Sequence, residues 1–239
     1  MSSTCPFDLC DGTGFRYDEA SNTAFDCRCR PQRVAFAKAR SLSAVIPRRY
    51  RDVAFERPPV TEIDPPRVVE EVRSFINRID DHLDVGRGLW FMGPVGTGKT
   101  TLAMLVSQAA LKAGRSVAIY SLPRLLNEIR DVSHRTERSH VDLLDRLTAV
   151  HLLHIDDVGA ERTTDWVLEE LYSIVNARYE DQRSMVITTN RDPDALGEQI
   201  GVRTVSRLVE MCDTVQLLGR DRRMDLRSGR GRHSAAHVH

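Results

Sequence analysis

The chain has 239 residues, of which 41% are hydrophobic and 28% are charged, and its formal net charge is zero. This length and composition predict one full globular domain with a smaller attachment, and the hydrophobic fraction is ample for one core. No apolar run approaches the roughly 18 residues that span a bilayer, and the N-terminus lacks the regions of a signal peptide, so we expect a cytoplasmic protein without membrane contact.

Four of the five cysteines lie close together near the N-terminus. They are Cys5, Cys10, Cys27 and Cys29. Because the cytosol is reducing, this grouping favours a tetrahedral Zn²⁺ site over disulfides. The C-x-C pair is tighter than zinc ligand pairs usually are, so four unrelated thiols stay open as the alternative. A segment as small as 1–30 cannot fold on its apolar content alone, so we expect its folding to be coupled to zinc binding.

Basic residues gather on both sides of the central part of the chain. Eight lie between positions 28 and 51 without an acidic residue, and six arginines lie between positions 220 and 232 against two aspartates. This distribution indicates contact with a polyanion, and a solvated linker with a disordered tail is the alternative. We expect a basic linker helix over 31–44 and a disordered arginine- and histidine-rich tail over 226–239.

The remaining part, residues 45–225, alternates helical and β-rich segments. Apolar residues recur with a helical period over 67–83, and further helices are expected over 99–112 and 165–179. The expected strands are 89–92, 117–121, 152–156, 185–189 and 214–218. Such nearly uncharged strands are typical of a parallel sheet buried on both faces. The alternation predicts an α/β fold with a five-stranded parallel sheet. Cys212 is expected to be a buried residue in a helical, apolar setting.

A glycine-rich loop follows the first of these strands. Residues 93–101 read GPVGTGKTT and fit G-x-x-x-x-G-K-[ST], which wraps the phosphates of a nucleotide between a strand and a helix. A fortuitous glycine loop is the alternative. The expected ATP ligands are Gly93, Gly96, Thr97, Gly98, Lys99, Thr100 and Thr101. Lys99 would place its ammonium between the β- and γ-phosphates, and the Thr100 hydroxyl would bind Mg²⁺.

Polar residues also follow the third and fourth strands. Asp156 and Asp157 end the third, and Asn190 follows the fourth. We expect Asp156 to bind Mg²⁺ through water and Asp157 to orient or deprotonate the attacking water. Asn190 would hold that water and sense the γ-phosphate. The alternative for the aspartates is a capped turn at Gly159, and His154 is expected to be packed in the core.

Taken together, several motifs resemble those of an AAA+ ATPase, and more narrowly those of bacterial helicase loaders of the DnaC/DnaI type and the related IstB-type transposition helpers. The matching segments are 46–52, the nucleotide loop, 155–159, 188–190, 206–208 and 219–223. The cysteine segment also looks like the zinc module in front of some DnaI-like loaders. Only 21 residues follow the last expected strand, so we expect no helical lid, and slow, partner-dependent hydrolysis.

The resemblance implies a role for Arg207 and several partners. Arg207 would be an arginine finger that reaches the nucleotide site of the next subunit, which implies an ATP-dependent homo-oligomer. The alternatives are a surface salt bridge on its helix, or Arg203 as the finger. In this family the AAA+ core grips single-stranded DNA and the N-terminal module docks on the hexameric replicative helicase.

The stretch expected to face DNA contains arginines but no aromatic residue between Tyr120 and Trp166. Its arginines are Arg124, Arg130, Arg135, Arg138 and Arg146. Because bases cannot stack there, binding would depend on phosphates and would be sequence-blind and salt-sensitive. The alternative is helical pairing with acids such as Asp131 and Asp142.

Three functions stay open from the sequence: a helicase loader, a transposition helper ATPase that acts on duplex DNA, and a nucleotide-gated adaptor with incidental hydrolysis.

Overall fold

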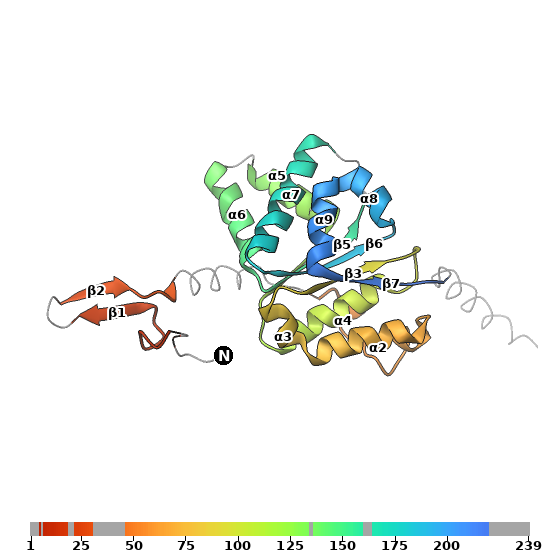
Figure 1. Cartoon of the computed structure of the whole chain (residues 1–239), viewed down its shortest axis with the longest axis horizontal. Helices are drawn as coiled ribbons and strands as arrows, with labels where there is room; N and C mark the ends of the chain where they lie inside the picture. Colours follow the sequence, from red (N-terminus) through yellow and green to blue (C-terminus); the bar gives the residue numbers. More distant parts are fainter. Residues whose placement is uncertain are drawn as a thin grey trace, which may run out of the picture.

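The computed structural model describes residues 5, 7–18, 22–30, 46–133, 136–159 and 164–219. The described residues form a small N-terminal module and an α/β body (Figure 1). The linker helix expected over 31–44 and the tail expected over 226–239 lie outside the described residues. None of the helices within these ranges is long and apolar enough to span a membrane.

The body contains the five-stranded parallel sheet expected from the sequence. Its strands are β3 (Gly88–Met92), β4 (Val117–Ser121), β5 (Leu152–Val158), β6 (Ser184–Thr189) and β7 (Cys212–Gln216). Their order is β4-β5-β6-β3-β7, and every neighbouring pair is parallel. The carboxyl ends of β3, β5 and β6 therefore share one edge of the sheet, which is where parallel α/β folds place their ligands.

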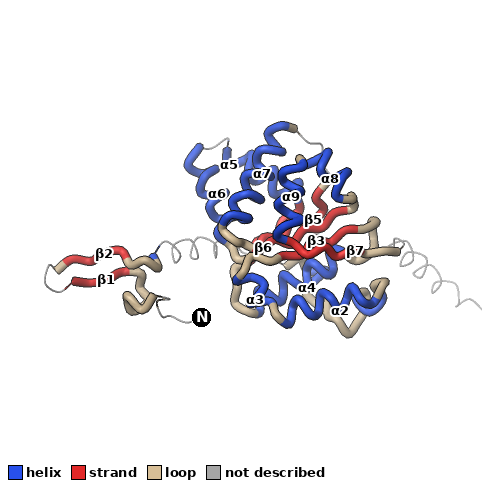
Figure 2. The backbone as a smooth tube through the Cα atoms, in the orientation of Figure 1, coloured by secondary structure: helices blue, strands red, loops and turns tan. Residues whose placement is uncertain are grey.

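Helices cover both faces of the sheet (Figure 2). One face carries α2 (Pro66–Asn77), α3 (Ile79–Asp84) and α4 (Lys99–Lys112). The other carries α5 (Leu122–Ser133), α6 (Glu137–Ala149), α7 (Asp165–Glu180), α8 (Pro193–Ile200) and α9 (Val202–Met211). Each face buries its own hydrophobic cluster against the sheet. Among the described residues, the last of which is 219, no helix follows β7.

Two local expectations were wrong. The single helix expected over 67–83 is broken at Arg78, whose backbone (φ −119°, ψ 32°) leaves the helical region. The helical period continues through the break because α2 and α3 both pack their apolar residues into one cluster. Cys212 is buried as expected, but it begins β7 rather than lying in a helix. Burial raises the pKa of its thiol to about 12, so it remains a neutral core residue.

The segment that precedes the helices of the body contains a short 3₁₀ helix, η1 (Arg48–Tyr50). A second, η2 (Val60–Glu62), precedes α2. The buried side chains of Tyr50 and Val60 show that this segment packs onto the body.

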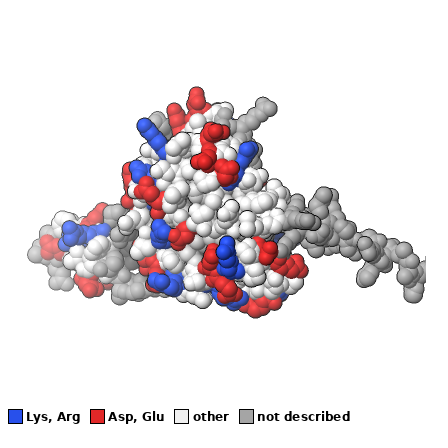
Figure 3. All heavy atoms as spheres, turned by 45° about the vertical axis from the view of Figure 1, so that its right-hand side comes forward, with Lys and Arg blue, Asp and Glu red and all other residues white. Residues whose placement is uncertain are grey.

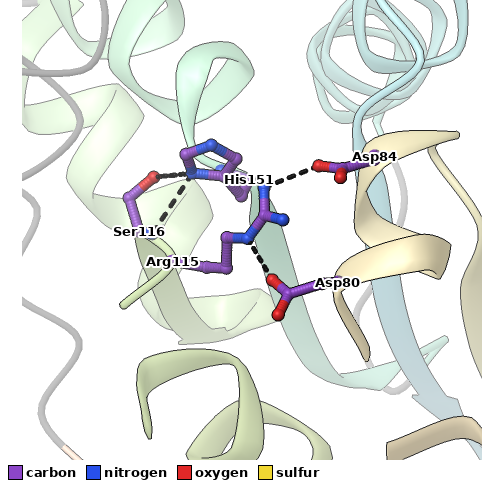
Figure 4. A network of polar contacts seen from close by, with 5 residues as sticks. All are labelled: Asp80, Asp84, Arg115, Ser116 and His151. Atoms are coloured by element: carbon purple, nitrogen blue, oxygen red, sulfur yellow. Dashed lines mark hydrogen bonds and ion pairs between the residues drawn. The ribbon is translucent and has the colours of Figure 1, made fainter. Parts of the chain in front are cut away.

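A polar network ties α3 to the amino edge of the sheet (Figure 4). Arg115, just before β4, contacts Asp80 and Asp84 at 2.6 Å each. Next to it, the backbone N–H of Ser116 donates to Nδ1 of His151 at 3.2 Å. Burial, aided by nearby arginines, lowers the pKa of His151 to about 4, so this nitrogen stays an acceptor at neutral pH. The network holds β4 and β5 at the edge opposite the nucleotide loop.

The N-terminal module is a hairpin of β1 (Phe15–Asp18) and β2 (Thr23–Asp26), paired antiparallel. All eight strand residues are exposed on both faces. The buried side chains of the described module are the thiols of Cys5, Cys27 and Cys29, with Cys10 packed against them. The hairpin therefore has no apolar core of its own, and the thiols occupy the position of one.

Candidate functional site

The glycine-rich loop lies between β3 and α4, and α4 begins at Lys99 as expected. Gly93, Gly96 and Gly98 have φ values of 142°, 78° and 103°, a region that other residues rarely adopt. Thr97 steadies the turn by donating its hydroxyl to the carbonyl of Pro94 at 2.9 Å. The loop thus brings backbone N–H groups to the positive end of the α4 dipole, where an anion is stabilised.

The ammonium group of Lys99 lies over the loop. Its Nζ donates to the carbonyls of Gly93 and Pro94 at 2.7 Å each. These contacts hold the charge beside the place where the loop would receive phosphates. A phosphate binding there would compete with the two carbonyls for the same ammonium, and its negative charge makes it the stronger partner.

Thr100 and Asp156 are brought together from elements far apart in the sequence. The Thr100 hydroxyl at the start of α4 donates to Asp156 Oδ1 on β5 at 2.9 Å. Thr188 on β6, the strand that lies between β5 and β3 in the sheet, donates its hydroxyl to the same oxygen at 2.7 Å. A hydroxyl and a carboxylate oxygen suit Mg²⁺, which also takes oxygens from water and phosphates. The donor set therefore fits the expected magnesium site.

Asp157 has an unusual backbone for a residue other than glycine, with φ of 61°. The β5–β6 register shifts between Ile155 and Val158, and the Asp157 N–H donates to Thr188 Oγ1 at 2.8 Å. A bulge of this kind changes the direction in which its side chains point. Strained backbone conformations such as that of Asp157 are frequent at functional sites. The Asp157 carboxylate is exposed at the edge where β3 and β6 end, and Asn190, also exposed, follows β6 directly.

Two supporting residues escaped the sequence analysis. Thr188 lies within an expected strand, and its hydroxyl contacts both Asp156 and Asp157. Ser107 on α4 lies 2.9 Å from Nδ1 of His154 on β5, and both are fully buried. His154 is thus packed, as expected, and with Ser107 it forms a second polar contact between α4 and β5. Neither pairing has a sequence signal, because each joins segments more than thirty residues apart.

Arg207 lies on α9, with its guanidinium carbon 4.1 Å from the ring centroid of Tyr179 on α7. Its Nη1 is 3.9 Å from a carboxylate oxygen of Glu210, within the same helix. The surface ion pair considered from the sequence therefore exists in this subunit, though only at long distance. The rival candidate, Arg203, is exposed at the start of the same helix.

The arginines expected to contact DNA differ in their surroundings. Arg130 lies over the ring of Trp166 at 5.2 Å, and Arg146 donates to the backbone carbonyl of Asp142 at 3.2 Å. Arg138 is exposed, whereas Arg135 lies outside the described residues. On the face shown in Figure 3, basic and acidic side chains are interspersed. The described part of that face offers no broad basic area for a phosphate backbone.

The four N-terminal thiols converge. All four sulfur atoms lie within 4.8 Å of one another, with 3.7 Å between Cys5 and Cys27 and 3.6 Å between Cys10 and Cys29. A tetrahedral site with Zn–S bonds of about 2.3 Å would separate its sulfurs by about 3.8 Å. None of these cysteines forms a disulfide. The cluster therefore fits zinc, and both members of the tight C-x-C pair belong to it.

Gly93→Ala should destabilise the body by about 2–4 kcal/mol, because an added Cβ would collide with the backbone carbonyl oxygen of Leu217 after β7. Gly114→Ala is the matched control. Gly114 also has a positive φ (76°), but nothing lies within 4 Å of its Cβ position, so only backbone strain of about 1–2 kcal/mol is expected. Urea unfolding of both variants measures the difference, and equal losses would show that the collision is relieved.

Comparison with known protein families shows to which family this chain and its site belong. The family model of IstB-like ATP binding proteins matches residues 43–228, which include the loop, both aspartates and Arg207. The chain belongs to this family. The resemblance indicated by the sequence motifs is thereby confirmed, and the IstB-like family is one of ATP-binding proteins.

The relatives of this IstB-like chain include helicase loaders and an insertion sequence ATP-binding protein. The replicative helicase loader DnaC of Escherichia coli (strain K12) is 25% identical over 140 residues, which cover 59% of this chain and 56% of DnaC. A putative insertion sequence ATP-binding protein of Sinorhizobium fredii is 31% identical over 152 residues, which cover 62% of this chain and 61% of that protein. The chain thus matches less than two thirds of the length of either relative.

A solved structure supports the fold of this IstB-like chain. The crystal structure of the DnaC helicase loader matches with a TM-score of 0.63 at 25% identity, over 72% of this chain and 100% of that one. The AAA+-type α/β core expected from the sequence is confirmed by this likeness.

Proposed function

We propose that this protein is an ATPase that delivers a hexameric replicative helicase to single-stranded DNA. The observation that carries the proposal is the likeness to the DnaC helicase loader, which extends over the whole of that solved chain. The sequence relationship to a protein named as a replicative helicase loader agrees with it. We propose residues 45–225 as the ATPase unit, residues 1–30 as the docking unit, and the cytoplasm as the place of action.

In this proposal the loop and Lys99 bind the phosphates of ATP, and Thr100 and Asp156 hold Mg²⁺. When bound, Mg²⁺ would offset charge on the β- and γ-phosphates. Asp157 accepts a proton from the attacking water, and Asn190 orients that water. Charge on the γ-phosphate is stabilised by Arg207 of a neighbouring subunit, so turnover depends on an ATP-bound homo-oligomer.

The N-terminal module is suited to a protein partner. Three aromatic side chains, Phe15, Tyr17 and Phe25, are 42%, 63% and 49% exposed on the hairpin. Such exposed aromatic groups are typical of protein interfaces. The described module carries three arginines against four aspartates, which disfavours a phosphate backbone. We therefore assign helicase docking to this module and DNA contact to the ATPase core.

The proposal is tested by light scattering on the protein mixed with the replicative helicase of its own genome, with and without ATP. A stable joint assembly that is lost in the full-length Cys27→Ser variant would support both the loader and the docking role. No joint assembly under any nucleotide condition would overturn the loader.

A transposition helper is the second candidate, because the family model and the Sinorhizobium relative are both of the insertion-sequence type. The two candidates differ in the DNA that they prefer. Binding to fluorescent oligonucleotides of one sequence, single-stranded and duplex, separates them. Tighter ATP-dependent binding to the duplex, without a helicase complex, would establish the helper.

Cys27→Ser should abolish binding of one zinc ion per chain and unfold the hairpin, because the thiol cluster takes the place of a core. A zinc chelator should do the same to the parent protein. Cys212→Ala is the matched control, since Cys212 is buried in the ATPase body. Elemental analysis and amide exchange over 5–30 measure the effect, and ATP affinity should stay unchanged. Full zinc content in Cys27→Ser would contradict the assigned ligand set.

A further inference from the structure

The side chain of Arg207 is held by a neighbouring helix. Its guanidinium carbon lies 4.1 Å from the centroid of the Tyr179 ring, which places the cation over the face of the ring. Tyr179 belongs to the last turn of α7, and Arg207 lies midway along α9. The Arg207 side chain nevertheless remains 35% exposed, so the contact fixes it without burying it.

Glu210 orients the ring. The Tyr179 hydroxyl donates to Glu210 Oε2 at 2.6 Å, and this hydrogen bond raises the pKa of Tyr179, which keeps the hydroxyl a donor. The other carboxylate oxygen is 3.9 Å from Arg207 Nη1, beyond hydrogen-bond distance. Glu210 is therefore engaged mainly with the tyrosine, not with the guanidinium.

The cluster is anchored to the sheet. Arg87, just before β3, donates to the backbone carbonyl of Glu210 at 2.9 Å and also pairs with Asp213 on β7. The end of α9 is thus tied to the two strands that flank it. A substitution at Tyr179 therefore removes the ring but leaves the contacts that Arg87 makes with Glu210 and Asp213 in place.

Stacking and phosphate binding use different parts of a guanidinium. A ring contacts its flat face, whereas its N–H groups lie in the plane and point outward from the edge. A phosphate is bound by that edge. A stacked arginine thus loses rotamer freedom before its phosphate arrives, which lowers the entropy lost on binding.

We propose that Tyr179 is a positioning residue, which holds Arg207 so that its edge meets the γ-phosphate of a neighbouring subunit. This inference rests on the proposed function, in which Arg207 acts in trans. Exposed cation–π contacts are weak, so loss of the ring should lower the turnover supported by a donated Arg207 by about two- to fivefold.

The test measures ATP hydrolysis by mixtures of full-length subunits in the presence of DNA. An Arg207→Ala subunit keeps its nucleotide site but supplies no finger, whereas an Asp157→Asn subunit binds ATP and supplies a finger but lacks the proposed base for hydrolysis. Their mixture should recover activity that neither has alone. The Tyr179→Leu change is then added to the Asp157→Asn subunit only, so its effect must cross the subunit interface.

Tyr179→Phe in the same Asp157→Asn subunit is the matched control, because it keeps the ring face and loses only the hydroxyl. We expect the phenylalanine donor to support most of the recovered activity and the leucine donor about two- to fivefold less, with equal assembly by light scattering. Equal activity with both donors would overturn the inference and leave the finger in trans. No recovery in the first mixture would instead overturn the finger itself, and with it this inference.

Discussion

Lys99→Ala should lower the affinity for ATP about 100-fold or more, whereas Arg207→Ala should leave it within about threefold. In the proposed site Lys99 contributes two or more charge-assisted hydrogen bonds to the phosphates of its own subunit, each worth about 1.5–3 kcal/mol. Its Nζ already lies over the loop, 2.7 Å from the carbonyls of Gly93 and Pro94. Arg207 is stacked on Tyr179 and is proposed to serve the next subunit.

Titration of a fluorescent ATP analogue against both variants gives the two affinities, and circular dichroism checks that both are folded. Turnover separates the roles further. Arg207→Ala should hydrolyse ATP on the order of 100-fold more slowly in the presence of DNA, because a finger stabilises charge that develops only in the transition state. Arg203→Ala is the matched control on the same helix, and it should stay near the parent rate. An equal loss of ATP affinity in Lys99→Ala and Arg207→Ala would refute the finger assignment.

Arg178→Met should lower the free energy of unfolding by about 3–5 kcal/mol, a large part of the stability of a typical domain. Arg178 is fully buried on α7. Its guanidinium donates to five backbone carbonyls, among them those of Leu147 and Ser184 at 2.6 Å each. Burial lowers its pKa to about 9, so it is still charged at neutral pH.

The size of this effect follows from what the substitution leaves behind. The end of α6 and the turn before β5 direct their carbonyls at one guanidinium, and methionine fills the volume without donating a hydrogen bond. Buried carbonyls without partners then cost about 1–3 kcal/mol each, partly offset because no charge has to be buried. Arg178→Lys should recover only part of the loss, since one ammonium has three donors at a single point.

Urea unfolding measures the change, with Arg78→Met as control. Arg78 pairs with Asp81 at 3.2 Å, but both side chains are about two thirds exposed. An exposed pair of this kind contributes about 1 kcal/mol or less. If Arg178→Met unfolded at the same urea concentration as Arg78→Met, water must reach the carbonyls that Arg178 contacts.

Local patterns in the sequence were enough to predict much of the fold. The α4 helix begins and ends at the expected residues, and all five strands were predicted close to their observed positions. Four of these strands are short, apolar and mostly buried, whereas β7, at the edge of the sheet, exposes three of its five residues. The break at Arg78 could not be predicted, since the apolar period runs through it. The apolar residues on both sides of the break pack into the same cluster. Cys212 was assigned to a helix for a related reason: β7 follows α9 without a loop.

The candidate site, like the fold, was predictable from the sequence only in part. By itself the sequence determined the nucleotide loop and the adjacent aspartates, because each is a short run of neighbouring residues, and several such runs together indicated the family. It favoured a zinc site over four unrelated thiols, but the tertiary structure showed that the four sulfur atoms converge. Only the tertiary structure decided that Thr188 bridges Asp156 and Asp157, that Ser107 meets His154, and that Tyr179 and Glu210 frame Arg207. Those contacts join side chains from different strands and helices. Sequence spacing carries no record of them, since strand order and helix packing alone bring such distant residues within a few ångströms.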